Sequence, residues 1–161
     1  MATKTDFSAP QWDLLRKAPL TASLIVSAAS PSGPVGLVQE SVAASKMILN
    51  EASTAKTPLV KSVSEDLRSN FSFPELPHTV DPAQLRASAI DTLKQSSALL
   101  TGKVSAEEAQ EYRQWLANIA QATAEAAKEG GFLGFGGTQV SAEEQAALAE
   151  IHEALGLPKA A

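Results

Sequence analysis

The chain has 161 residues, of which 44% are hydrophobic and 5% aromatic, a length and composition that predict one globular domain and exclude global disorder. It contains no cysteine, which excludes disulfide bonds, thiolate metal sites and a cysteine nucleophile. The net charge of −5 comes from residues 105–161, where nine acidic residues accompany three basic ones, so the sequence predicts no nucleic-acid partner.

The N-terminal third is predicted to form three helices, at about residues 9–17, 20–29 and 35–52. Pro19 is expected to separate the first two helices, because proline lacks the amide hydrogen that a helix interior needs. The segment SPSGP at 30–34 is expected to separate the second helix from the third.

The most hydrophobic stretch, residues 18–29, is about 12 residues long, whereas a membrane-spanning helix needs roughly 20. Asp6 and Asp13 precede this stretch, where a secretory signal would carry a short basic region. The lack of cysteine also fits a reducing compartment. We therefore expect a cytoplasmic protein without a transmembrane segment.

The middle of the chain is predicted to contain two further helices and a long connection between them. The first helix is expected to start at Pro58 and end near Leu67, because proline is favoured in a first helical turn. Residues 69–80 contain two prolines and no periodicity, so they are expected to connect the helices. The second helix is expected to follow its capping residue Asp81 and to stop at Gly102.

The C-terminal third carries the strongest helix signals, since the pentapeptide VSAEE occurs at both 104–108 and 140–144. In each copy the serine and the second glutamate match a capping box, in which each side chain bonds the other residue's backbone amide. Apolar residues follow at spacings of three and four, which predicts one helix over 106–129 and another ending before Gly156. Leu157 is expected to fold back on that last helix.

The pattern of these elements predicts the fold class. No segment alternates polar and apolar residues over four or more positions between good turn signals, so no strand is expected. We predict an all-α fold, a single-domain bundle over residues 1–161 with six or seven helices joined by loops rich in glycine and proline.

The predicted loop at 130–140 opens with GGFLGFGG, an unusual mixture of glycine and large apolar residues. A phosphate-binding loop would need a lysine and a preceding strand, and this segment has neither. The preferred interpretation is that the glycines reverse the chain while Phe132, Leu133 and Phe135 cover the end of the bundle. The alternative is that these side chains are exposed and contact a partner protein or a membrane surface.

The two tryptophans are further candidates for partner contact. Trp12 and Trp115 each lie beside leucine in a predicted amphipathic helix, where core packing is the ordinary expectation. An exposed tryptophan would instead suit a protein-binding surface. The possible partner contacts are therefore Phe132, Leu133, Phe135, Trp115 and Trp12.

No catalytic residue, metal ligand or cofactor site is predicted. The only histidines are His78 and His152, and neither has the glutamate spacing of a di-iron or zinc motif. The paired glutamates of the two capping boxes lie in first helical turns, where the helix dipole favours negative charge without any catalytic role. A G-x-S-x-G nucleophile motif is also lacking.

The C-terminal sequence resembles known helical proteins. The segment EGGFLGFGG and the following S-x-x-E helix that ends in LGL are similar to the C-terminal half of a group of small uncharacterised bacterial proteins, which implies a bacterial, cytoplasmic, helical protein. The helix and turn pattern is also similar to the TerB tellurite-resistance family, in which an acidic A-D-G turn precedes an S-x-x-E helix. The corresponding turns here, at 29–33 and 128–130, lack the aspartates that are tied to metal binding in that family.

These observations favour a non-enzymatic helical domain that binds another protein or a copy of itself. Two alternatives stay open. One is a small-molecule or metal site between the helices, with a TerB-like stress-response role, because small core residues could leave a cavity. The other is peripheral membrane contact through the loop at 130–137, which the acidic C-terminal part disfavours because anionic lipids repel it.

Overall fold

The structure is a computed structural model that describes residues 1–29, 33–70, 82–129 and 140–158. These residues form a short 3-10 helix, η1 (Lys4–Asp6), and six α-helices: α1 (Ala9–Ala29), α2 (Gly33–Thr54), α3 (Pro58–Ser69), α4 (Pro82–Leu100), α5 (Ala106–Glu129) and α6 (Ala142–Leu155). They contain no strand, so the predicted all-α fold is confirmed.

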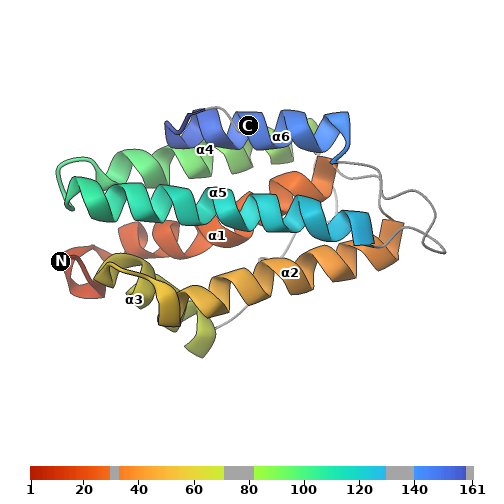
Figure 1. Cartoon of the computed structure of the whole chain (residues 1–161). Coiled ribbons are helices and arrows are strands. Elements are labelled where there is room, and N and C mark those ends of the chain that lie inside the picture. The colour runs from red at the N-terminus through yellow and green to blue at the C-terminus, as the bar shows by residue number, and fades with distance from the viewer. Residues whose placement is uncertain (30–32, 71–81, 130–139, 159–161) are drawn as a thin grey trace.

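The helices form a bundle with α1 and α5 at its centre (Figure 1). These two helices pack against each other, with α2 and α3 on one side of them and α4 and α6 on the other. The N-terminus lies at the end of the bundle where α5 begins. Because α5 contacts helices on both sides, only part of its surface is left to face solvent.

One hydrophobic core joins all six α-helices. The apolar stripe predicted for α5 is buried wherever its side chains are described, including Tyr112, Leu116 and Ile119. Both central helices also bury alanines, among them Ala22 on α1 and Ala120 on α5. Small side chains allow helix axes to approach closely, which accounts for a core that contains few aromatic residues.

The predicted helix break at Pro19 is wrong, because α1 runs without interruption from Ala9 to Ala29. Proline has no amide hydrogen, so the carbonyl of Leu15, four residues earlier, loses its usual helical donor. That carbonyl instead accepts a hydrogen bond of 2.7 Å from the hydroxyl of Tyr112 on α5. Burial raises the pKa of Tyr112, which keeps the phenol protonated and able to donate. A bond between two helices thus replaces the one that proline removes.

Both predicted capping boxes are present. In α6 the amide of Glu144 donates to the hydroxyl of Ser141 at 3.2 Å, and the amide of Ser141 donates to the Glu144 carboxylate at 2.8 Å. In α5 the same pair of contacts joins Ser105 and Glu108, at 3.2 and 3.3 Å. The local sequence therefore determines where these two helices start.

The predicted end of the last helix is also confirmed. Gly156 adopts a left-handed conformation, with φ of +68°, which glycine tolerates without strain. The amide of Leu157 then donates to the carbonyl of His152 at 2.9 Å, and the Leu157 side chain is buried. This arrangement satisfies free carbonyls of the last turn while it adds an apolar contact.

Asp66 on α3 holds the N-terminal residues against the bundle. Its carboxylate accepts hydrogen bonds from the indole nitrogen of Trp12 at 3.0 Å and the ammonium of Lys4 at 3.2 Å. It also forms an ion pair of 2.7 Å with Arg16. Burial raises the pKa of Asp66, but the two hydrogen bonds and the positive charges outweigh burial and leave the pKa below its ordinary value.

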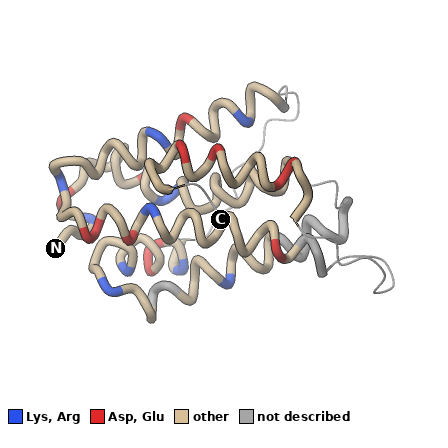
Figure 2. Tube along the Cα trace, turned by 45° about the horizontal axis from the view of Figure 1, so that its top comes forward, with Lys and Arg blue, Asp and Glu red and all other residues tan. Residues whose placement is uncertain are grey.

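Glu108 makes a second link to the N-terminal residues, beyond its role in the α5 cap. Its carboxylate accepts a hydrogen bond of 2.7 Å from the backbone amide of Ala2. Burial raises the pKa of Glu108, but the hydrogen bonds from Ala2 and Ser105 outweigh that effect and leave the pKa below its ordinary value. Figure 2 shows acidic and basic residues close together in this part of the molecule, near the N-terminus.

Candidate functional site

The sequence named five possible contact residues, and the structure describes two of them. Phe132, Leu133 and Phe135 lie outside the described residues, so their roles stay predictions. Trp12 and Trp115 are only 4% and 1% exposed. Both indoles are therefore almost fully buried, which is against the alternative of exposed tryptophans. The ordinary expectation of core packing holds for both.

Each tryptophan is buried against another aromatic ring. The ring of Trp12 lies 5.9 Å from that of Phe7, and the ring of Trp115 lies edge-on to Tyr112 at the same distance. The indole nitrogen of Trp115 has no hydrogen-bond partner within the described part of the chain. Because an unpaired buried N–H is unfavourable, packing of the ring is what holds Trp115 in place.

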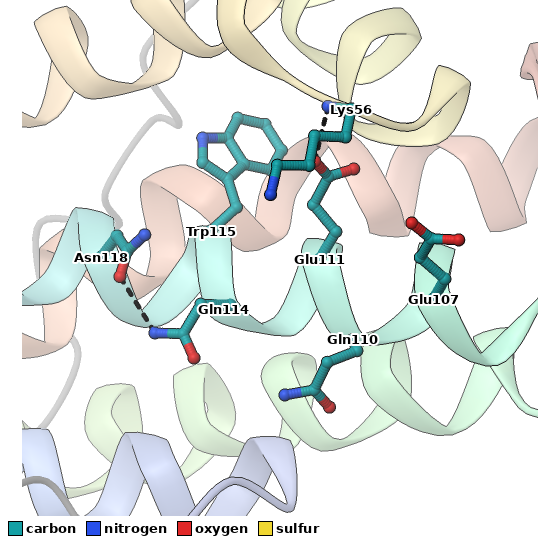
Figure 3. A pocket seen from close by; sticks show the side chains of 7 residues that line it. All are labelled: Lys56, Glu107, Gln110, Glu111, Gln114, Trp115 and Asn118. Carbon is teal, nitrogen blue, oxygen red and sulfur yellow. Dashed lines mark hydrogen bonds between the residues drawn. The ribbon is translucent and has the colours of Figure 1, made fainter.

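A groove of about 450 Å³ runs along the outer face of α5, beside the turn that joins α2 to α3 (Figure 3). Its lining consists of one lysine from that turn and six residues of α5: Lys56, Glu107, Gln110, Glu111, Gln114, Trp115 and Asn118. Residues three and four apart lie on one face of a helix, which explains why α5 supplies most of the groove. Five of the seven are exposed, Glu111 is half-buried and Trp115 is buried.

Glu111 lines the groove, and its side chain is held in place by hydrogen bonds to the start of α3. Its carboxylate accepts hydrogen bonds from the backbone amides of Lys56 and Thr57, at 2.6 and 2.8 Å, and from the hydroxyl of Thr57. Thr57 precedes the first residue of α3, where the helix dipole favours a negative charge. Glu111 therefore anchors the start of α3, and its carboxylate is already occupied.

The other polar side chains of the groove are largely free to bind. The amide of Gln114 donates to the side-chain carbonyl of Asn118 at 3.0 Å, which leaves donors and acceptors on both groups unused. Among the described residues, Glu107 and the ammonium of Lys56 form no ion pair. Figure 3 shows Lys56 on the side of the groove away from Gln110 and Gln114. The groove therefore has amides along one side and a single cation on the other.

A second, smaller pocket of about 190 Å³ is less suited to binding, because its charges are already paired. It lies between α1, α3 and α4 and includes Asp13, Arg16 and Lys17 in its lining. Lys17 forms an ion pair of 2.6 Å with Asp13, while Arg16 is paired with Asp66. The groove on α5 is therefore the better candidate site.

The described ranges contain neither a metal-binding cluster nor a membrane-spanning helix. No group of three or more histidine, aspartate or glutamate residues there is arranged to hold a metal ion. None of the helices in those ranges combines the length and the apolar character needed to cross a bilayer.

This groove is not predicted from the sequence, although part of its signal is present there. Gln110, Gln114 and Asn118 recur every four residues on the polar side of the helix predicted over 106–129. The contribution of Lys56 has no local signal, because it depends on how α3 packs against α5.

Comparison with known proteins gave no match to a family model, a curated protein or a solved structure. The resemblances to TerB and to the small bacterial proteins therefore stay expectations from the sequence.

Proposed function

We propose that this protein is a helical protein-interaction domain whose binding surface is the groove along α5. The observation that carries the proposal is the row of exposed amides at Gln110, Gln114 and Asn118. This row lies beside Glu107 and Lys56, which form no ion pair with any described residue. An exposed row of this kind offers many hydrogen bonds to a partner without any rearrangement of the core.

The character of the groove favours a protein partner over a small molecule. Small-molecule sites are mostly apolar and bury most of the ligand surface. Here the lining is mainly amides and carboxylates, and five of its seven residues are exposed. Polar, hydrated surfaces of this kind are common at protein–protein contacts, where water-mediated and direct hydrogen bonds occur together.

Site-specific photo-crosslinking in cells tests this proposal. A photoreactive amino acid replaces Gln114 in the groove or, as a matched control, Lys94, which is exposed on α4. We expect a discrete protein adduct from position 114 and none from position 94. An adduct of twice the mass of the chain would identify the partner as a second copy.

Competition makes the result specific to the groove. Excess unlabelled wild-type protein should suppress the adduct, whereas the Q110A/N118A double variant should not. No adduct from position 114, equal adducts from both positions, or equal competition by the double variant would each contradict the proposal.

A further inference from the structure

We infer that the partner enters the groove as an extended peptide segment with one basic side chain, and that it lies parallel to the axis of α5. This inference rests on the proposed function and specifies the chemistry of its partner. It follows from the spacing of the amides, from their hydrogen-bonding capacity and from the charges at the two sides of the groove.

The spacing of the amide row matches an extended chain. Positions four residues apart on an α-helix are separated by about 6 Å along the axis, a spacing that the amides of Gln114 and Asn118 adopt when their mutual hydrogen bond opens to admit the peptide. Every second residue of an extended chain is about 6.7 Å from the last. Over Gln110, Gln114 and Asn118 the mismatch accumulates to only about 1.5 Å, which long, flexible side chains can absorb.

The chemistry of the amides also matches a peptide backbone. In an extended chain the N–H and C=O of one residue point to the same edge, and the next residue points to the opposite edge. A glutamine or asparagine side chain carries one acceptor and two donors. Each amide of the row can therefore accept from the N–H and donate to the C=O of the same peptide residue, and the next amide can do so two residues further on.

The charges predict where the partner carries its basic side chain. Glu107 is exposed, has no ion-pair partner in the described part of the chain, and lies at one end of the row. A lysine or arginine at that end would form a charge-assisted hydrogen bond. Lys56 lies on the opposite side of the groove and would repel a second cation there. We therefore expect one basic residue, located at the Glu107 end.

The length of the lined surface sets the size of the segment. Glu107 and Asn118 are separated by about 16 Å along the helix axis. About five extended residues span that distance. The bound segment is thus short, in the range of a peptide motif.

NMR titration of the full chain tests the inference directly. Capped heptapeptide pools with randomised flanks carry lysine or arginine, glutamine, or glutamate at one fixed position. We expect the basic pools to shift the side-chain amide resonances of Gln110, Gln114 and Asn118, the glutamine pool to shift them less, and the glutamate pool not at all. Either no shift with any pool or equal shifts with the acidic and basic pools would overturn the inference.

Variants and modified peptides separate the contributions. Each amide-to-alanine change in the row should weaken affinity about five- to a hundredfold, the range of two neutral hydrogen bonds. Gln95→Ala on α4, whose amide donates to Asp91, should leave affinity unchanged. Glu107→Gln should abolish the preference for basic over glutamine pools while binding of the glutamine pool persists. Two further peptides are methylated on alternate backbone nitrogens, one at the odd positions and the other at the even positions. One of the two should bind at least tenfold more weakly than the other, and equal affinity of both would also count against the inference.

The outcome also distinguishes this inference from the proposed function. If the peptides fail to bind but position 114 still yields its specific adduct, the groove contacts a folded surface and only the extended-peptide inference is lost. If both experiments fail, the groove is not a protein-binding surface.

Discussion

The centre of the bundle and its N-terminal end satisfy buried polar groups in different ways. Between α1 and α5, neutral groups pair: the Tyr112 hydroxyl donates to the Leu15 carbonyl, and the hydroxyls of Thr123 and Ser23 lie 3.2 Å apart. At the end where α5 begins, carboxylates accept several hydrogen bonds each, as Asp66 does. Neutral pairs do not change with pH over the ordinary range, whereas carboxylates do.

This difference implies that the two regions lose their stabilising hydrogen bonds under different conditions. A neutral pair in the core fails only when one partner is removed, and the other is then left buried and unsatisfied. The carboxylates at the N-terminal end, Asp66 and Glu108, stabilise the fold less when they are protonated, because each then loses its charge and part of its capacity to accept hydrogen bonds. Four changes, ordered from the largest expected effect to the smallest, probe this contrast.

The largest effect is expected from Tyr112→Phe at the centre of the bundle. The substitution keeps the ring but removes the donor to Leu15, whose carbonyl has no helical partner because of Pro19. Leaving that carbonyl buried and unpaired should lower the free energy of unfolding by about 1–3 kcal/mol. Urea denaturation at pH 7 measures this loss, and circular dichroism should show an unchanged fold. A loss below about 0.5 kcal/mol would mean that another donor serves Leu15.

A smaller, pH-dependent effect is expected at the N-terminal end. The pKa values of Asp66 and Glu108 lie below their ordinary values of 3.8 and 4.5. Both carboxylates therefore contribute stability that is fully present above those values and is lost as the pH falls through the lower values of the folded protein. Unfolding measured between pH 7 and pH 2 should show this decline.

Asp66→Asn measures how much of this pH-dependent stability comes from Asp66 on α3. At pH 7 the variant should be less stable by about 1–2 kcal/mol, because a charged acceptor of several bonds becomes neutral. Its stability should also fall less steeply with acid than that of the wild type. Asp91→Asn on the exposed face of α4 is the matched control and should stay within about 0.5 kcal/mol. A parallel decline in the wild type and Asp66→Asn would show that Asp66 is not the titrating group.

A third change tests whether Glu111 belongs to the scaffold or to the binding surface. Glu111→Ala removes the acceptor at the start of α3 and should cost about 1 kcal/mol, a typical value for a lost helix cap. Glu107→Ala, four residues earlier and without an ion-pair partner among the described residues, should cost less, about 0.3 kcal/mol, because it loses only the interaction of a first-turn carboxylate with the helix dipole. Equal stability of the two variants would show that Glu111 does not hold the start of α3 and is available to a ligand.

The same contrast explains how far the sequence could predict the molecule. The starts of α5 and α6 were predicted correctly because their caps lie within a few residues of each other, as Ser141 and Glu144 do. The predicted break at Pro19 is wrong because the hydrogen bond that replaces the missing one comes from Tyr112, which is 97 positions from its partner Leu15 in the chain. The groove was missed for a similar reason, since Lys56 reaches α5 only through tertiary packing. Local signals thus fixed the helices, while the site depends on contacts between them.

The smallest single effect, and the most discriminating, is expected from Pro19→Ala. Alanine restores the amide hydrogen that can bond the Leu15 carbonyl, which favours the helix. The change also makes the unfolded chain more flexible and removes buried ring atoms, which both oppose that gain. These effects partly cancel, so we expect a net change within about 1 kcal/mol in either direction.

The double variant, Pro19→Ala with Tyr112→Phe, tests whether a backbone amide can replace the Tyr112 hydroxyl as the donor to the Leu15 carbonyl. With alanine at position 19, the Leu15 carbonyl has a backbone donor and no longer depends on Tyr112. Tyr112→Phe should therefore cost about 1 kcal/mol less in the Pro19→Ala background than in the wild type, a coupling measurable by a urea double-mutant cycle. Additive costs would mean that the phenol stabilises the core by a route other than the carbonyl that proline exposes. A coupling of the expected sign would establish that an interior proline is tolerated here because a second helix supplies the missing hydrogen bond.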